Sequence, residues 1–283
     1  MVGIKEKAFD FNGAKIAYTD TGPEDGRVLF CAHGLLSNGR DYDFLALELA
    51  KHGYRTIAID LPGRGRSDPL ADPNLYSPPY YAPFCLALIH HITGGASFDW
   101  LGVSLGGMIG MGVAHVEGVN MERLILVDVG AEIPGSALDL VTQLARAPSA
   151  FASKDAAIKV FKQRCAAWGI NDEKIWDHLI AHNIIEEGDG LYGFHYDPDI
   201  ALPMSDANDD LVFWGIWEGI TQPTLLIRGG KSVLLPEEIA QKMQSTYKGE
   251  KFDEVVFAAC GHVPNLMQDD HIAAITDWLT NKE

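Results

Sequence analysis

The sequence predicts an α/β protein whose sheet is mostly parallel and doubly wound, with helices on both faces. Short runs rich in aliphatic and β-branched residues alternate along the chain with longer segments of helical period. The later runs are apolar throughout, with no alternation of apolar and polar residues, which is typical of strands buried on both faces. We expect six such strands, at residues 28–32, 56–59, 98–103, 124–127, 224–227 and 255–258.

The segments between these strands predict the helices. Residues 42–52 form an amphipathic stretch that stops at Gly53, and a helix of small residues begins at Leu105. The last helix carries Ile272, Ile275 and Leu279 at spacings of three and four, so these side chains share one face and are expected to pack on the sheet.

The alternation is interrupted once, between residues 131 and 220, where no convincing core strand is found. We expect a helical cap there, inserted after strand 6, with residues 1–130 and 221–283 forming one core domain. Trp168, Trp176, Trp214 and Trp217 are expected to bury a small core of the cap's own. Its predicted helices span 138–146, 154–168, 173–185 and 209–219, with a Gly/Asp/Pro-rich passage at 187–203.

The composition excludes several classes of function. The 283 residues include 22 Lys and Arg against 39 Asp and Glu, a net charge of −17, which argues against binding to nucleic acid or to an anionic membrane surface. No run reaches the length of a membrane span, and the N-terminus lacks a signal-peptide pattern. The four scattered cysteines form no metal or disulfide pattern, so a cytoplasmic location is expected.

Ser104 is the sharpest chemical signal. It lies in Gly102-Val103-Ser104-Leu105-Gly106-Gly107, where a buried strand meets a glycine-rich helix. A serine on such a tight strand-to-helix turn is held out at the carboxyl end of the sheet, and small neighbours are needed because the turn is crowded. The same position would also suit a serine that only caps the helix. In this context we expect a nucleophile.

A serine nucleophile needs a base, and a histidine base needs a partner that fixes its tautomer. His262 follows the last strand directly, in Ala259-Cys260-Gly261-His262, at the sheet edge where Ser104 also projects. His52, His115 and His271 fall on helices and are expected to be solvated or packed.

The oxyanion donors are expected to be main-chain groups. Ala32-His33-Gly34-Leu35 follows the first buried parallel strand, where Gly34 lets the Leu35 N–H turn toward a tetrahedral oxyanion. The Leu105 N–H at the head of the helix would be the second donor. His33 is expected to shape this loop rather than to react.

These motifs together resemble the α/β-hydrolase superfamily across nearly the whole chain. The resemblance rests on residues 32–34, 102–107 and 260–262 and on Asp60-Leu61-Pro62-Gly63-Arg64-Gly65-Arg66-Ser67-Asp68. Within the superfamily the chain looks most like small bacterial esterases and meta-cleavage-product hydrolases that carry a helical cap after the sixth strand. The stretch 63–67 is not a phosphate loop, because it lacks the Lys-Ser/Thr ending.

The acid of the expected triad departs from the family's usual pattern. Similar enzymes place it after the penultimate strand, but residues 228–236 contain no carboxylate, and Glu237 falls in the following helix. Some relatives use the end of the strand before the cap, where this chain has Asp128. Asp128 is the predicted acid. A Ser–His dyad helped by water or Ser232, or another carboxylate, stays open.

The sequence therefore predicts a serine hydrolase that cleaves small to medium carboxylic esters through an acyl-enzyme, with Ser104, His262 and Asp128 as the triad. The alternatives are a C–C bond hydrolase of the meta-cleavage type, which needs a cationic group in its pocket, and a non-catalytic ligand-binding protein on a hydrolase scaffold. Arg146, Lys159, Lys162 and Arg164 are the cationic residues to check, although a solvated helix face is expected for them. We expect no cofactor, no metal site, and a monomer or homodimer. The acidic pairs Asp209-Asp210 and Asp269-Asp270 are of the kind common at helix starts, and no His-x-x-x-His spacing accompanies them.

Overall fold

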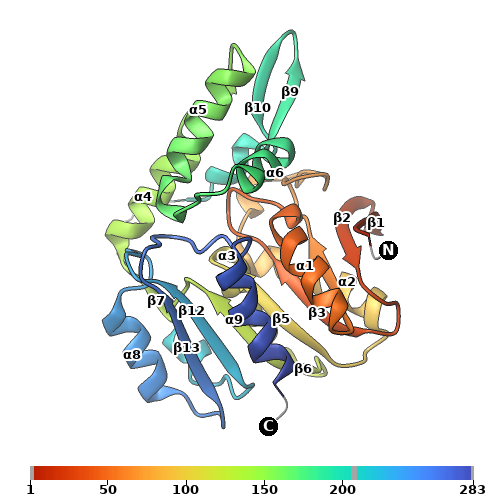
Figure 1. The fold of residues 1–283 in the computed structure, drawn as a ribbon, viewed down its shortest axis with the longest axis vertical. Helices are drawn as coiled ribbons and strands as arrows, with labels where there is room; N and C mark the ends of the chain where they lie inside the picture. Colours follow the sequence, from red (N-terminus) through yellow and green to blue (C-terminus); the bar gives the residue numbers. More distant parts are fainter. Residues whose placement is uncertain (1–2, 205–208, 282–283) are drawn as a thin grey trace.

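A computed structural model describes residues 3–204 and 209–281. An eight-stranded sheet runs through the molecule in the order β1-β2-β4-β3-β5-β6-β12-β13, with helices on both faces (Figure 1). The strands from β4 to β13 pair in parallel, as the sequence predicts. Their bounds are Lys5–Phe11 (β1), Ala14–Thr21 (β2), Arg27–Ala32 (β3), Tyr54–Ile59 (β4), Phe98–Val103 (β5), Met121–Val127 (β6), Thr224–Gly229 (β12) and Phe252–Phe257 (β13).

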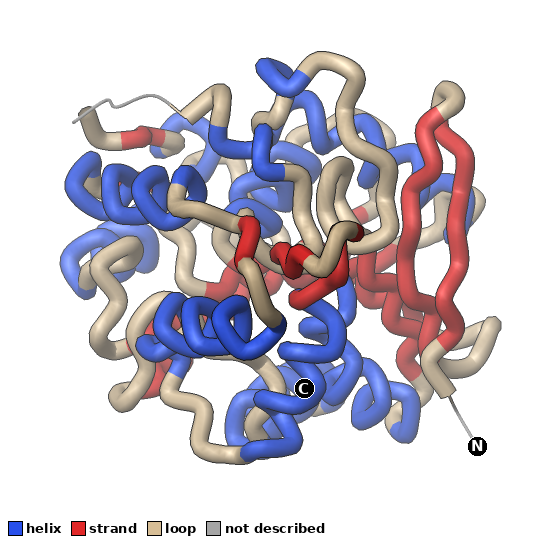
Figure 2. The backbone as a smooth tube through the Cα atoms, turned by 90° about the horizontal axis from the view of Figure 1, so that it is seen from above, coloured by secondary structure: helices blue, strands red, loops and turns tan. Residues whose placement is uncertain are grey.

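Strands β1 and β2 form an antiparallel hairpin that the sequence analysis does not predict. The hairpin lies at the margin of the molecule beside the N-terminus (Figure 2). Its turn is Asn12-Gly13, with φ of 55° and 83°, the left-handed pair that favours tight hairpins. This dipeptide is the signal that could have identified the two strands.

Alternate side chains of each central strand pack into two different hydrophobic cores, one on each face of the sheet. This explains why the strands are apolar throughout. Leu29 and Cys31 pack on one face of the sheet, under α1 (Asp43–Lys51) and α9 (Asp269–Thr280). Phe30 and Ala32 pack on the other face, under α2 (Pro78–Thr93), α3 (Leu105–Val113) and α8 (Glu237–Thr246). Residues on both faces of a parallel sheet are shielded from water in this way.

The last strand differs from the expectation. β13 runs from Phe252 to Phe257 rather than over 255–258, and it is the edge strand, so its side chains are alternately exposed. Val256 is 43% exposed. An apolar run alone does not tell a central strand from an edge strand.

The segment between β6 and β12 lies above the carboxyl ends of the parallel strands (Figure 1), and we call it the insertion. Three of its predicted helices are present with other bounds: α4 (Gly135–Arg146), α5 (Lys154–Arg164) and α6 (Glu173–Asn183). The predicted extension of α5 to 168 is wrong, because a separate 3-10 turn, η3 (Ala166–Trp168), follows it. The helix predicted at 209–219 is reduced to α7 (Trp214–Trp217).

The insertion is not purely helical. A hairpin replaces the end of the helix predicted at 173–185 and part of the Gly/Asp/Pro-rich passage at 187–203. It consists of β9 (Ile184–Gly188) and β10 (Leu191–Phe194) around Asp189-Gly190, and η4 (Pro198–Ala201) follows. β8 (Ala150–Phe151) completes a three-stranded sheet, and β7 (Glu132–Ile133) pairs with β11 (Leu211–Val212). None of these strands joins the eight-stranded sheet, in agreement with the absence of a core strand from this part of the sequence.

The four tryptophans of this segment do not share one cluster. Trp168 and Trp176 pack against the cluster formed mainly by the insertion, as expected, and Trp168 also packs against the core cluster under α1 and α9. Trp217 is fully buried in the main core, where its indole N–H donates to the Met243 carbonyl, and Trp214 packs against the same core. The expectation is therefore wrong for Trp214 and Trp217, because the last residues of the insertion pack against the main core beside the sheet. No helix among the described residues has the length and apolarity that a bilayer crossing requires.

Candidate active site

Ser104 occupies a strained turn between β5 and α3. Its φ is 49° and its ψ is −111°, and its side chain makes no capping hydrogen bond to the helix. Two glycines permit this turn: a Cβ on Gly106 would lie 1.9 Å from the Ala32 carbonyl oxygen, and one on Gly102 would lie 2.3 Å from Gly106. The hydroxyl is thus held by backbone geometry at the carboxyl edge of the sheet.

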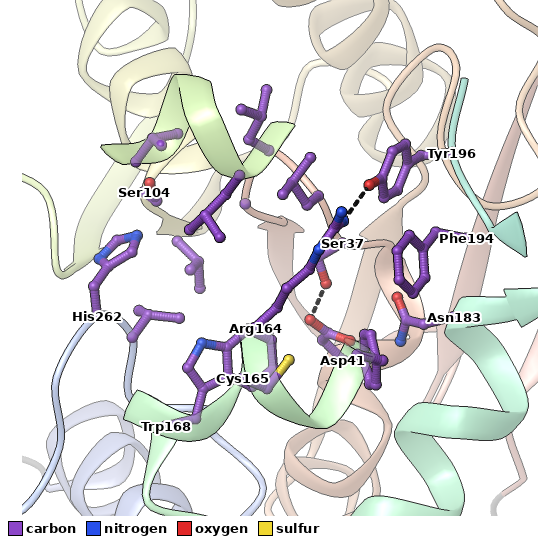
Figure 3. Close-up of a pocket in the computed structure, with 18 residues that line it drawn as sticks. Ser37, Asp41, Ser104, Arg164, Cys165, Trp168, Asn183, Phe194, Tyr196 and His262 are labelled. Atoms are coloured by element: carbon purple, nitrogen blue, oxygen red, sulfur yellow. Dashed lines mark hydrogen bonds between the residues drawn. The ribbon is translucent and has the colours of Figure 1, made fainter. Parts of the chain in front are cut away.

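Asp128 and His262 are in direct contact. His262 Nδ1 lies 2.7 Å from Asp128 Oδ2, and the Gly229 N–H donates to Asp128 Oδ1 at 2.9 Å. Asp128 is fully buried just beyond β6 and also has positive φ, 53°. Because the carboxylate accepts from Nδ1–H, it leaves Nε2 of His262 as the basic nitrogen. Figure 3 shows this ring beside Ser104 on one wall of a pocket.

The loop after β12 contributes no acid to this site. The Ser232 hydroxyl accepts hydrogen bonds from the N–H groups of Leu234 and Leu235, within its own turn. Glu237 is exposed and pairs with Gln241 on the same helix. Of the groups weighed from the sequence as partners of His262, Asp128 is the one that contacts it.

His33 orients the loop that carries the expected oxyanion donor. Its Nε2 accepts from the Leu61 N–H at 3.0 Å, so Nδ1 carries the proton and donates to the Gly34 carbonyl at 2.7 Å. Burial lowers the pKa of His33 to about 3, which keeps the ring neutral. Since C=O and N–H point in opposite directions in a trans peptide, the Leu35 N–H is directed away from His33. Leu105 begins α3, where the first N–H groups have no partner in the helix.

The stretch from Asp60 to Asp68 connects the core to the insertion. The Gly65 N–H donates to the His195 carbonyl at 2.9 Å, and the Asp197 N–H donates to the Gly63 carbonyl at 2.7 Å. Arg64 is fully buried and donates from Nε to the Leu35 carbonyl at 3.1 Å. The Arg64 guanidinium therefore braces the loop that carries Leu35, and the glycines serve close packing rather than phosphate binding.

The pocket beside Ser104 is mainly apolar and is shared between the core and the insertion. The core supplies Ser104, His262 and the loop that carries Leu35, and the insertion supplies residues of α4, α5, η3 and β10 (Figure 3). Its apolar lining consists of Leu35, Leu36, Val103, Val141, Leu144, Phe161, Trp168, Phe194 and Val263.

Arg164 is the cationic group of this pocket, and its expected place on a solvated helix face is wrong. It ends α5, and its side chain extends across the pocket in Figure 3. Its Nη1 donates to the Tyr196 hydroxyl at 2.7 Å, and its guanidinium lies 4.4 Å from the Phe194 ring centre. Within residues 3–204 and 209–281, the structure gives Arg164 no carboxylate partner.

Asp41 is the acidic group of the pocket wall. Its carboxylate accepts from the Ser37 hydroxyl, and Asn183 of α6 lies beside it (Figure 3). Burial raises the pKa of Asp41 to about 7. Sequence reasoning missed Asp41, Asn183 and Tyr196, because no motif marks them. For the fourth polar residue, Arg164, the sequence gave a partial signal, because it falls in the last turn of a predicted cap helix.

The comparison with known families agrees with this geometry. The α/β-hydrolase family model matches residues 28–277. The chain belongs to the α/β-hydrolase family. A curated relative from Cupriavidus necator, a 3-hydroxybutyrate-oligomer hydrolase, is 33% identical over 94% of this chain and 93% of its own. A non-heme chloroperoxidase of Streptomyces lividans is 26% identical over 80% of this α/β-hydrolase.

Solved structures support the same family. A protein from Rickettsia typhi superposes with a TM-score of 0.87 at 31% identity, covering 100% of both chains. An α/β hydrolase from Novosphingobium aromaticivorans superposes with a TM-score of 0.86 at 26% identity, covering 99% of both chains. The family match and a hydrolase relative that aligns over 94% of the chain together assign the protein to the hydrolases.

Proposed function

We propose that this α/β-hydrolase is a serine esterase that forms an acyl-enzyme on small to medium carboxylic esters. The observation that carries the proposal is the hydrogen bond between Asp128 and His262 at the pocket that Ser104 lines. A carboxylate, an imidazole and a strained serine at one sheet edge are the parts that nucleophilic acyl transfer requires.

In the proposed mechanism His262 Nε2 takes the proton of Ser104 as the hydroxyl oxygen attacks the ester carbonyl carbon. Asp128 holds Nδ1–H and stabilises the imidazolium that forms. His262 then returns the proton to the leaving alcohol. Water, activated by the same nitrogen, attacks the acyl-enzyme and releases the acid.

The Leu35 and Leu105 N–H groups are proposed to hold the oxyanion. The support for Leu35 is its peptide orientation, which His33 and Arg64 set from two sides. The support for Leu105 is its place at the start of α3, next to the nucleophile, where the helix dipole also favours negative charge. Such main-chain donors need no reorganisation during the reaction.

Residues 131–220 are proposed to act as the cap of the core domain, 1–130 and 221–283. Support comes from α4, α5 and β10, which supply Val141, Phe161 and Phe194 to the pocket above Ser104. Apolar walls from both parts would exclude water from the ester while leaving the catalytic groups on the sheet.

Arg164 supports substrates that carry a carboxylate as well as an ester. A half-buried guanidinium with no carboxylate partner among the described residues favours an anionic ligand. A linear oligomer of 3-hydroxybutyrate, the substrate named for the Cupriavidus relative, has ester bonds and one terminal carboxylate. Short oligoesters of this kind are therefore our proposed substrates.

Arg164 also favours a second candidate, the C–C bond hydrolase, since that reaction needs a cation in the pocket. Turnover of a coloured ring-fission product by the purified protein would support it. The ligand-binding alternative rested on the lack of an acid after β12, and the contact of Asp128 with His262 removes that support.

The test is hydrolysis of a linear 3-hydroxybutyrate dimer, followed by acid release, with wild type and Ser104→Ala. The proposal expects turnover by the wild type and a loss of about 10⁶-fold in kcat for the variant. Equal rates for the two proteins, or turnover of the ring-fission product alone, would overturn it.

A further inference from the structure

A cluster of metal-ligating side chains lies outside the candidate active site, where the insertion rests on the core. His178 and His182 are four residues apart on α6, so their rings share one helix face, and Asp43 at the start of α1 faces them. One ligand atom from each of the three residues lies within 4.8 Å of the others. The two imidazole ring centres are 4.5 Å apart.

Asp43 has one carboxylate oxygen in use and one free. Its Oδ2 accepts two bonds from Arg40, at 2.7 Å from Nε and 2.6 Å from Nη2. Its Oδ1 is buried and has no hydrogen-bond partner among the described residues. The residue is only 2% exposed, so water does not readily satisfy that oxygen. A buried carboxylate oxygen without a partner is costly, and a ligand would remove the cost.

The nearby arginines pair with carboxylates. Arg40 contacts Glu6 through Nη1 at 2.5 Å as well as Asp43, and Arg66 contacts the other carboxylate oxygen of Glu6 at 2.7 Å. His178 Nε2 lies 3.6 Å from Asp43 Oδ2 and donates its proton to the Arg40 carbonyl at 2.8 Å, so Nδ1 is the unprotonated nitrogen of the neutral ring. A cation bound here would meet two imidazoles and a carboxylate rather than an unpaired arginine.

We propose that Asp43, His178 and His182 bind a divalent transition-metal ion of the zinc class. Two imidazoles and one carboxylate suit zinc, copper or nickel better than magnesium or calcium, which prefer oxygen ligands. Zinc bonds of about 2.0–2.1 Å hold the ligand atoms within about 4 Å of one another. A small rotation of the side chains would close a site whose ligand atoms lie within 4.8 Å. A water molecule would complete four-coordination.

The ion would join the core to the insertion beside the pocket. α6 contacts η1 (Gly39–Tyr42), the short turn that precedes α1, and Figure 1 shows α6 above α1. The pocket residues Asp41 and Asn183 are close neighbours in sequence of Asp43 and His182. Binding would therefore fix α6 against α1 and stabilise the folded chain by mass action. The sequence signal is His178-x-x-x-His182. Our expectation of no metal site missed it because it looked for that spacing only beside the acidic pairs.

The test is a zinc titration by calorimetry on chelator-treated protein, with the thermal midpoint measured with and without ZnCl₂. We expect one equivalent of zinc and a raised midpoint. Affinity should fall by at least about tenfold in His182→Gln and in Asp43→Asn, as loss of even an outer contact costs that much. Asp43→Asn also removes the ion pair with Arg40 and could therefore destabilise the fold. His182 is half-exposed, so His182→Gln should fold normally and test zinc binding alone.

Two controls separate this site from other histidines. His52→Gln removes an exposed histidine of the α1 end, and Ser104→Ala alters the candidate active site; both should bind zinc as the wild type does. No saturable binding to the wild type, unchanged affinity in His182→Gln, or equal binding of MgCl₂ would overturn the proposal.

Discussion

The core and the insertion hold their pocket residues in different ways. Ser104 and Asp128 lie on the core where strands end, each with positive φ, so backbone turns fix their positions. Arg164 lies on the insertion at the end of a helix, and its long side chain is positioned by Tyr196 and by backbone carbonyls. We infer that the core sets the reaction and the insertion sets which substrate enters. The two regions should therefore respond to mutation in different kinetic constants.

The largest expected effect comes from the core. Asp128→Asn should lower kcat by about 10⁴-fold, because the amide no longer holds His262 in the tautomer that leaves Nε2 basic. The measurement is steady-state hydrolysis of a p-nitrophenyl ester, with the thermal midpoint checked for both proteins.

Ser232→Ala is the matched control for that prediction. Among residues 3–204 and 209–281, its hydroxyl hydrogen-bonds to the N–H groups of its own turn and not to His262, so kcat should stay near the wild-type value. A strong loss in Ser232→Ala together with a mild one in Asp128→Asn would favour the dyad and contradict the triad.

The next effect comes from the insertion. Arg164→Gln should lower kcat/KM for a carboxylate-bearing ester by about 10- to 100-fold, since a hydrogen bond to a charged group contributes about 1.5–3 kcal/mol. A neutral ester of the same acyl length should lose much less. Paired assays with the two esters measure this difference.

Lys162→Gln removes a charge from the same helix at a position that pairs with Glu173 rather than lining the pocket. It should leave both esters unchanged. If Arg164→Gln and Lys162→Gln behaved alike, or if Arg164→Gln slowed both esters equally, the division of roles between core and insertion would be wrong.

The smallest effect concerns stability. Burial lowers the pKa of His33 to about 3 from its ordinary value of 6.5, so the unfolded chain takes up a proton between these pH values and the folded chain does not. The unfolding free energy should therefore fall as pH drops through this window, by at most about 1.4 kcal/mol per pH unit from this group. His33→Gln should show a shallower dependence in denaturant unfolding between pH 7 and about pH 4. Parallel curves for the two proteins would argue against a neutral, buried His33.

The sequence was most informative where function depends on local backbone geometry. The existence of six parallel strands, the turn at Ser104 and the position of His262 all follow from short contiguous patterns, because strand periodicity and glycine placement are local properties. Asp128 could be narrowed to a leading candidate, since it ends a predicted strand. Its partner His262 lies 134 residues further along the sequence, so the contact between the two side chains can be established only from the folded structure.

The rest depends on packing between distant segments. Arg164 reaches the pocket because the C-terminal end of α5 lies beside it, whereas helical period alone favoured a solvated face. The hairpins at Asn12-Gly13 and Asp189-Gly190 have a local signal, the Asn-Gly or Asp-Gly dipeptide of a tight turn. A prediction based on apolar periodicity does not use it. Trp217 was assigned to the insertion because a sequence boundary does not show where the chain returns to the core.

Labelling with a fluorophosphonate probe, with the adduct mapped by mass spectrometry, tests the central claim most directly. The account predicts one adduct, on Ser104, that is lost in Ser104→Ala and formed far more slowly in Asp128→Asn. Labelling that persists in Ser104→Ala, or an adduct on another residue, would contradict it.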